Sequence, residues 1–163
     1  MWYIALFLVF LAADQAVKLW VVQHLALYES APLLPGFLEL RYIQNTGGGW
    51  SILSDYTWLL SILTAFIMLV LLYLLLRRIV RHPLGRTACV LLLAGGCGNL
   101  IDRLRLGHVD MFNFQFISYP VFNVADIAVV IGMILAAVYY LFLYEKHDGP
   151  ERGERHGDAA SHQ

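Results

Sequence analysis

The sequence predicts an all-α membrane protein, with four transmembrane helices and a small extracytoplasmic β-sheet or loop platform at the membrane surface. Hydrophobic residues make up 60% of the 163-residue chain and charged residues only 14%, whereas soluble domains carry about a quarter. Four apolar runs approach the roughly 20 residues that a helix needs to cross a hydrocarbon core. Two connections between the runs are rich in aromatic residues and alternate in polarity, which favours strands. The net charge of −1 gives no reason to expect a nucleic-acid partner.

The four runs cover about residues 2–25, 56–76, 87–101 and 124–144. The first has the apolar length of a secretory signal peptide, but no A-x-A-like cleavage site follows it and Asp14 interrupts its centre, so we expect a retained helix. The third run is short and extends only by taking in an arginine near each end. Residues 1–144 form the predicted membrane domain. Residues 145–163 are polar and rich in glycine, so we expect a disordered cytoplasmic tail.

Lysine and arginine side chains orient the helices, because short cytoplasmic connections carry an excess of them. The basic residues gather between the second and third runs and in the tail: Arg77, Arg78, Arg81, Arg86, Lys146, Arg152 and Arg155. Both termini and that connection are therefore expected in the cytoplasm, and the segments of about residues 28–55 and 104–122 outside. Lys18, in the outer half of the first run, departs from this rule and could snorkel to the interface.

Polar side chains gather toward the outer ends of the predicted helices. A charge inside the bilayer costs about 2.5–3.5 kcal/mol on insertion scales, so each needs a partner or a function. The set comprises Asp14, Asn99, Asp102, Arg103, Asp110, Asn123 and Asp126, with Asn45 in the first outer connection. Gly95, Asn99 and Asp102 fall on one face of the third helix, and the glycines around them let a neighbouring helix approach closely.

Asp126 has two possible roles. Asn123 and Asp126 have the spacing of a capping box at the start of the fourth helix, and the helix dipole favours an anion there, so Asp126 can be a structural cap. Asp110, however, follows the third helix, and antiparallel packing of the third and fourth helices would bring it to the depth of Asp126. Two carboxyl groups in one cleft share a proton, so one can activate water while the other polarises a carbonyl. We therefore predict an aspartic-protease dyad of Asp110 and Asp126, with Asp126 as the base.

Three other interpretations compete with the dyad. A transporter or proton channel would use Asp14, Asp102 and Arg103 as a relay, but the polar residues crowd toward the outer half instead of crossing the bilayer. Ser51 suggests a serine protease, although the chain has no G-x-S-x-G and no convincing His/Asp set. A structural interaction protein would account for the apolar helices but not for the carboxylates. The chain has neither CxxC nor HExxH, so no motif indicates a metal site.

Four blocks, "DQAVKLWV", "NTGGGWSIL", "GGCGNLIDRLRLGHVDMF" and "PVFNVADIAVVIG", resemble in order the signature blocks of the bacterial lipoprotein signal peptidase (signal peptidase II) family, over about residues 13–132. The resemblance implies a four-helix bundle in the bacterial cytoplasmic (inner) membrane, with both termini cytoplasmic and the active site near the outer face. It implies an intramembrane aspartic endopeptidase that removes the signal peptide from diacylglyceryl-modified prolipoproteins, just before the lipidated cysteine. The resemblance implies no metal and no cofactor. We expect a monomer whose partners are this substrate and membrane lipid.

By motif, the resemblance assigns catalysis to Asp110 and Asp126. The residues expected to support the site or bind substrate are Asp14, Lys18, Asn45, Gly47, Gly95, Asn99, Asp102, Arg103, Asn123 and Ala125. Two departures from the family pattern matter. The block "GHVD" is one residue shorter than the usual Gly-x-Val-x-Asp, which leaves Asp102 as the alternative to Asp110. The block "GGWS" stands where the family tends to have Ala-Phe-Ser, which would change the shape of the loop over the substrate.

Overall fold

The computed structural model describes residues 1–45, 57–105 and 108–149 of the chain. Its long helices are α1 (Trp2–His24), α2 (Thr57–Leu76), α3 (Pro83–Arg105) and α4 (Val124–Phe142), followed by the short α5 (Tyr144–His147). Within these ranges, four helices are long and apolar enough to cross a membrane, which confirms the predicted fold class. The third helix is longer than the predicted run at both ends and takes in Arg86 near its start and Arg103 and Arg105 near its end.

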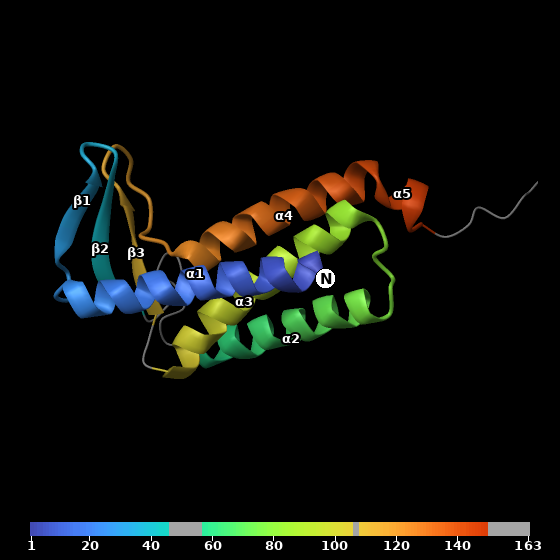
Figure 1. Cartoon of the computed structure of the whole chain (residues 1–163), viewed down its shortest axis with the longest axis horizontal. Coiled ribbons are helices and arrows are strands. Elements are labelled where there is room, and N and C mark those ends of the chain that lie inside the picture. Colours follow the sequence, from blue (N-terminus) through green and yellow to red (C-terminus); the bar gives the residue numbers. More distant parts are fainter. Residues whose placement is uncertain (46–56, 106–107, 150–163) are drawn as a thin grey trace, which may run out of the picture.

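The centre of the bundle is α3, which packs against α1, α2 and α4. About half of its span is buried, whereas the span of α2 has no buried residue. Figure 1 shows α4 and α2 on opposite sides of α3, with α1 drawn over α3. Among the described elements, α1 also packs against α4, while α2 packs against α3 alone. The apolar side chains that α2 exposes are therefore those that face lipid acyl chains in a membrane.

Small residues let α3 and α4 approach closely. A methyl group placed on Gly98 would lie 2.6 Å from Oδ2 of Asp14 and 3.0 Å from Cβ of Ala125. A methyl group on Gly95 would collide with the backbone carbonyl oxygen of Ala125. The glycines of α3 thus serve the close approach that the sequence predicted, and they bring α1 and α4 to the same level of α3.

A three-stranded antiparallel sheet lies at one end of the bundle (Figure 1). Its strands are β1 (Ser30–Leu34), β2 (Leu38–Asn45) and β3 (His108–Phe114), in the order β1-β2-β3. The alternation over residues 37–43 predicted β2, and that over residues 110–123 predicted part of β3. A register shift in the β2–β3 pair between Leu40 and Ile43 leaves Ile43 opposite Asp110. The sheet therefore carries one of the predicted catalytic carboxylates.

A small apolar cluster fixes the sheet to the end of α1. Val21 of α1, Tyr42 of β2 and Met111 of β3 are buried together, and Val21 and Met111 are fully covered. Because Asp110 is the chain neighbour of Met111, this packing also fixes the height of Asp110 above the bundle.

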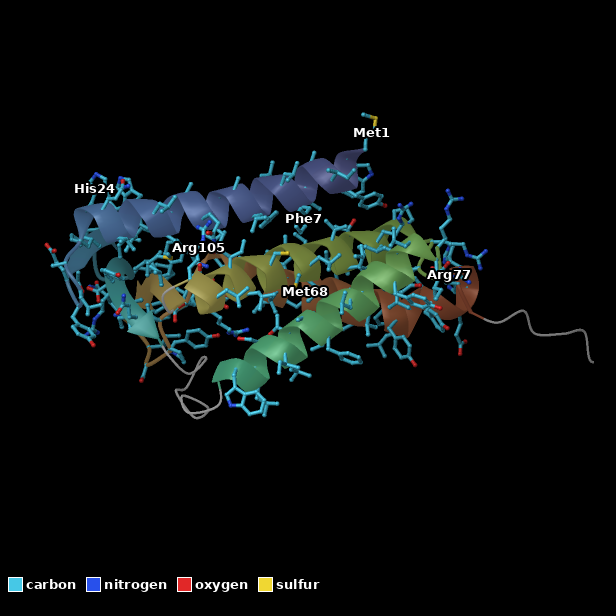
Figure 2. All side chains as sticks on the ribbon, turned by 90° about the horizontal axis from the view of Figure 1, so that it is seen from below. Met1, Phe7, His24, Met68, Arg77 and Arg105 are labelled. Atoms are coloured by element: carbon cyan, nitrogen blue, oxygen red, sulfur yellow. The ribbon has the colours of Figure 1, made fainter. Side chains whose placement is uncertain are left out.

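The opposite end of the bundle is joined by the carboxylate of Asp148. Figure 2 shows Met1 and Arg77 near that end, and His24 and Arg105 near the other. Asp148 accepts hydrogen bonds from the backbone N–H groups of Arg81 and His82, each at 3.0 Å from its Oδ2 atom, and from the Tyr139 hydroxyl at 2.6 Å. Burial by itself raises the pKa of Asp148, but the hydrogen bonds from Tyr139, His82 and Arg81 outweigh it and lower the pKa below the ordinary value. Helix α5 and these contacts lie in the segment that the sequence assigned to a disordered tail; residues 150–163 lie outside the described part.

Candidate active site

The start of α4 forms the capping box that the sequence predicted. The backbone N–H of Asp126 donates to Oδ1 of Asn123 at 3.0 Å, and the backbone N–H of Asn123 donates to Oδ2 of Asp126 at 3.1 Å. The other oxygen of Asp126, Oδ1, accepts the amide Nδ2 of Asn99 at 2.8 Å. Both oxygens of Asp126 thus have a donor, one from its own helix cap and one from α3.

Asn123 also contacts the second carboxylate. Its amide Nδ2 donates to Oδ1 of Asp110 at 2.8 Å and to Oδ1 of Asn99 at 3.2 Å. Asn123 is 1% exposed and Asp110 is 4% exposed, whereas Asp126 is only partly buried. Asp110 and Asp126 come from a strand and a helix start, and the structure brings both into contact with the same asparagine.

Arg103 adds a positive charge beside these groups. Its guanidinium, on α3, interacts electrostatically with Asp126, Asp102 and Asp110. One of its terminal nitrogens, Nη1, donates to Oγ1 of Thr64 at 2.9 Å. Arg103 therefore extends from α3 toward α2 as well as toward the start of α4.

Asp14, Lys18 and Asp102 form a separate buried ion cluster between α1 and α3. The ammonium nitrogen of Lys18 lies 2.7 Å from Oδ2 of Asp14 and 2.5 Å from Oδ2 of Asp102. The amide Nε2 of Gln15 donates to Oδ2 of Asp14 at 3.1 Å and to Oδ1 of Asp102 at 3.3 Å. Lys18 is 4% exposed. The possibility that Lys18 snorkels is therefore wrong, because Lys18 faces two carboxylates inside the bundle.

This ion cluster continues to α4 through a backbone hydrogen bond. The other oxygen of Asp14, Oδ1, accepts the N–H of Ala125 at 2.9 Å. Ala125 is 2% exposed and lies against Gly95 and Gly98 of α3. The small size of Ala125 thus serves the packing, and its N–H ties α4 to α1 one residue before Asp126.

Some of the predicted residues lie wholly or partly outside the described part of the chain. Asn45 ends β2 and stands opposite His108 in the strand register, and its side chain lies outside the described part. Gly47 and Ser51 lie outside the described residues. Asp102, the alternative to Asp110, contacts Lys18 and Gln15, whereas Asp110 contacts Asn123.

Two residues that contact the predicted set were not singled out from the sequence. Thr64 lies in the most apolar of the four helices, and a hydroxyl there is a signal that a polar partner lies nearby. Gln15 follows Asp14 directly in the chain. Their contacts with Arg103 and Asp102 could not be predicted, because both of those residues lie on another helix, α3.

The geometry combines groups suited to acid–base chemistry. Asp110 and Asp126 are both hydrogen-bonded to Asn123 and interact electrostatically with Arg103. Two carboxyl groups in such a site can share one proton and exchange it with a bound reactant. The buried polar side chains in the described part of the chain are Asp14, Lys18, Asn99, Asp102, Asp110 and Asn123. They form two groups, Asp14–Lys18–Asp102 and Asn99–Asp110–Asn123, that are connected through the backbone N–H of Ala125 near the start of α4. This arrangement at one level of the bundle does not favour the relay across the bilayer that a proton channel needs. Within the described ranges, His, Cys, Asp and Glu side chains form no group of three that could hold a metal ion.

Comparison with known proteins gives a consistent result. Residues 6–142 match the model of the family described as signal peptidase (SPase) II. A curated protein from Streptococcus pyogenes serotype M5 (strain Manfredo), "Lipoprotein signal peptidase", is 39% identical over 128 residues, which cover 78% of this chain and 84% of that protein. Its counterpart from serotype M3 (strain ATCC BAA-595 / MGAS315) has the same identity and coverage.

Two solved structures, both described as bacterial membrane enzymes studied by the in meso method, have the same fold. The first superposes with a TM-score of 0.80 at 28% identity and covers 92% of each chain. The second has a TM-score of 0.79 at 29% identity and covers 86% of this chain and 92% of the other.

Proposed function

Since the chain belongs to the signal peptidase II family, we propose that it is an aspartic endopeptidase that cleaves the signal peptide from diacylglyceryl-modified prolipoproteins, just before the lipidated cysteine. Asp110 and Asp126 form the catalytic dyad. The single observation that carries this assignment is Asn123, whose amide donates to Asp110 while its backbone N–H donates to Asp126. That arrangement supports the dyad over a purely structural cap, because a cap alone requires no second carboxylate.

In the proposed reaction, Asp126 is the base. Two N–H donors and the N-terminus of α4 stabilise its carboxylate form, while Asp110 is the more buried group and carries the shared proton. Asp126 takes a proton from water as the water oxygen bonds to the scissile carbonyl carbon, and Asp110 gives its proton to the carbonyl oxygen. The C–N bond then breaks, the leaving amine of the lipidated cysteine takes the proton held by Asp126, and Asp110 regains its own from the collapsing intermediate.

Asn99, Asn123 and Arg103 hold this pair. Asn99 and Asn123 donate to the two carboxylates through their amides, which fixes the carboxyl planes without adding a competing charge. The positive charge of the Arg103 guanidinium offsets part of the negative charge that remains when Asp110 and Asp126 share one proton.

We infer the orientation from charge. Arg77, Arg78, Arg81 and Arg86 lie in or beside the connection between α2 and α3, at the end of the bundle away from the sheet. Under the positive-inside rule this end is cytoplasmic, so the sheet and the dyad belong at the outer face. A lipidated cysteine has its acyl chains in the outer leaflet and its signal peptide across the membrane, and both can reach a site at this depth.

The substrate arrives laterally through the lipid between α2 and α4. The described parts of α2 and α4 both pack against α3 and make no direct packing contact with each other. The α1 side is closed by the Asp14–Lys18–Asp102 cluster, whereas Arg103 lies between Thr64 of α2 and Asp126 of α4. The protein acts as a monomer with membrane lipid around it, and the reaction uses no metal or cofactor.

The test is a cleavage assay with purified protein and a diacylglyceryl-modified prolipoprotein in detergent or liposomes. Asp110→Asn and Asp126→Asn are each expected to abolish cleavage, with the wild-type unfolding temperature largely kept because Asn retains hydrogen-bonding groups at both positions. The matched control is Asp148→Asn, which changes a hydrogen-bonded carboxylate at the other end of the bundle and should still cleave. Wild-type-like cleavage by either dyad variant would rule out this mechanism, and cleavage of an unlipidated substrate at the same rate would rule out the substrate class.

A further inference from the structure

Thr64 connects α2 to the candidate active site. Its hydroxyl donates to the backbone carbonyl oxygen of Leu60, one turn earlier in α2, at 2.7 Å. Because the hydroxyl proton is used in that bond, Oγ1 presents a lone pair, and Nη1 of Arg103 donates to it at 2.9 Å. The direction of both hydrogen bonds is therefore fixed by the chemistry of the groups.

Several carboxylates lie close enough to Arg103 to attract its guanidinium. Its guanidinium is partly buried and interacts with Asp126, Asp102 and Asp110. A guanidinium fork closes readily on one carboxylate in a bidentate pair. Such a pair with Asp126 would occupy the carboxylate oxygens that the proposed reaction needs for water, and the bond to Thr64 opposes it by holding one arm of the fork toward α2.

We propose that Thr64 is a positioning residue, whose hydroxyl holds the Arg103 guanidinium beside the Asp110–Asp126 pair without letting it close on Asp126. The proposal rests on the proposed function of that pair. Thr64 does not touch the substrate in this role; it acts through Arg103. This role also explains why α2 carries a polar side chain at the level of Arg103, although among the described elements α2 packs on α3 alone.

The hydroxyl and the methyl group of Thr64 have separable contacts. The methyl Cγ2 lies on the side of Gly96, 3.8 Å from where a Cβ on that glycine would stand. Thr64→Val keeps the shape and that contact but removes the hydroxyl, whereas Thr64→Ser keeps the hydroxyl and removes the methyl. A role in packing and a role in positioning Arg103 therefore predict opposite rankings of the two variants.

The experiment measures kcat and KM for lipidated prolipoprotein with both variants. For Thr64→Val we expect kcat to fall roughly 10- to 100-fold, with KM within about twofold, because a group in the site is displaced while the substrate contacts remain. Thr64→Ser should stay within about threefold of wild type. Thr87→Val is the matched control: Thr87 also donates to a backbone carbonyl, that of Pro83 at 2.9 Å, but lies partly exposed near the start of α3, away from Arg103. The variant should behave as wild type.

A second readout separates failure of this inference from failure of the proposed function. In protein labelled with ¹⁵N-arginine, NMR should show slowly exchanging guanidinium signals of Arg103 in wild type and Thr64→Ser, and their loss in Thr64→Val; an Arg103→Lys sample assigns them. Wild-type kinetics or unchanged Arg103 signals in Thr64→Val would overturn the positioning role, as would a Thr64→Ser variant more impaired than Thr64→Val. A wild-type protein that fails to cleave lipidated prolipoprotein would instead overturn the proposed function, while the NMR comparison still decides whether Thr64 holds Arg103.

Discussion

Asp14 and Ala125 stand 111 residues apart in the chain, yet the carboxylate of Asp14 accepts the backbone N–H of Ala125 at 2.9 Å. The first four N–H groups of a helix lack partners within the helix, and α4 uses a side chain of α1 for one of them. The next residue along α4 is Asp126. The position of a predicted catalytic group therefore depends on a helix that is distant in sequence.

Lys18 should matter more for stability than Asp14. Lys18→Met leaves Asp14 and Asp102 buried together without their shared cation, so we expect a loss of about 3–5 kcal/mol in the free energy of unfolding. Asp14→Asn leaves one Lys18–Asp102 pair and still offers an oxygen to Ala125, so the loss should be about 1–2 kcal/mol. Thermal unfolding in detergent micelles would measure both, and equal losses would contradict the charge arrangement described for this cluster.

Gly98→Ala should disturb the bundle more than Gly96→Ala. The new methyl group at position 98 would meet Asp14 and Ala125, which are fixed by hydrogen bonds, and overpacking of this kind costs roughly 1–3 kcal/mol. At position 96 the neighbour is the side chain of Met68, at 3.1 Å, and a methionine can move aside. Unfolding temperatures of the two variants, measured side by side, would show a reversed order if α1 and α4 were free to separate.

Asn123→Ser isolates the amide of Asn123 from its role as a helix cap. Serine is also a good N-cap, so α4 should keep its start, but the donors to Asp110 and Asn99 are lost. We expect kcat to fall by roughly 10²-fold, the effect of removing one preorganised donor, with an unfolding temperature close to that of wild type. A variant with full activity would show that the amide does not organise the pair.

Asp148 should contribute to the stability of the folded protein in a pH-dependent way. Its pKa in the folded protein lies below the unfolded value of about 3.9, so its contribution is fully present above that value and is lost as the pH falls through the folded pKa. Wild type should therefore exceed Asp148→Asn in stability at pH 7 by roughly 1–3 kcal/mol, and this gap should shrink below about pH 4. Glu145→Gln, which changes an exposed carboxylate of α5, is the control; a gap between wild type and Asp148→Asn that is independent of pH would contradict the assignment.

Local patterns in the sequence predicted the parts of the fold that depend on neighbours in the chain. The capping box needs only the spacing of Asn123 and Asp126, and it is present as predicted. The four membrane helices follow from apolar length. Strand β1 was not predicted because Pro32 interrupts a short segment with little alternation.

The side-chain partners across helix interfaces could not be predicted, because no local pattern encodes which side chains of two helices meet. Lys18 could pair within α1 or with any neighbour, and the structure was needed to place it between Asp14 and Asp102. The contact of Thr64 with Arg103 depends on the rotation of α2 about its axis. The catalytic roles of Asp110 and Asp126 stay predictions, although the contact of both with Asn123 is now described.

The ion cluster between α1 and α3 also bears on how the protein is made. Of the four spanning helices α3 is the least apolar, and its charged group Asp102 would be costly in lipid by itself. The chain is synthesised from the N-terminus, so Lys18 is already in the membrane when Asp102 arrives. The first helix thus supplies the counter-ion for the third before the fourth arrives. When the fourth helix arrives, the backbone N–H of Ala125 donates to Asp14. The counter-ion of Asp102 therefore enters the membrane before Asp102 itself.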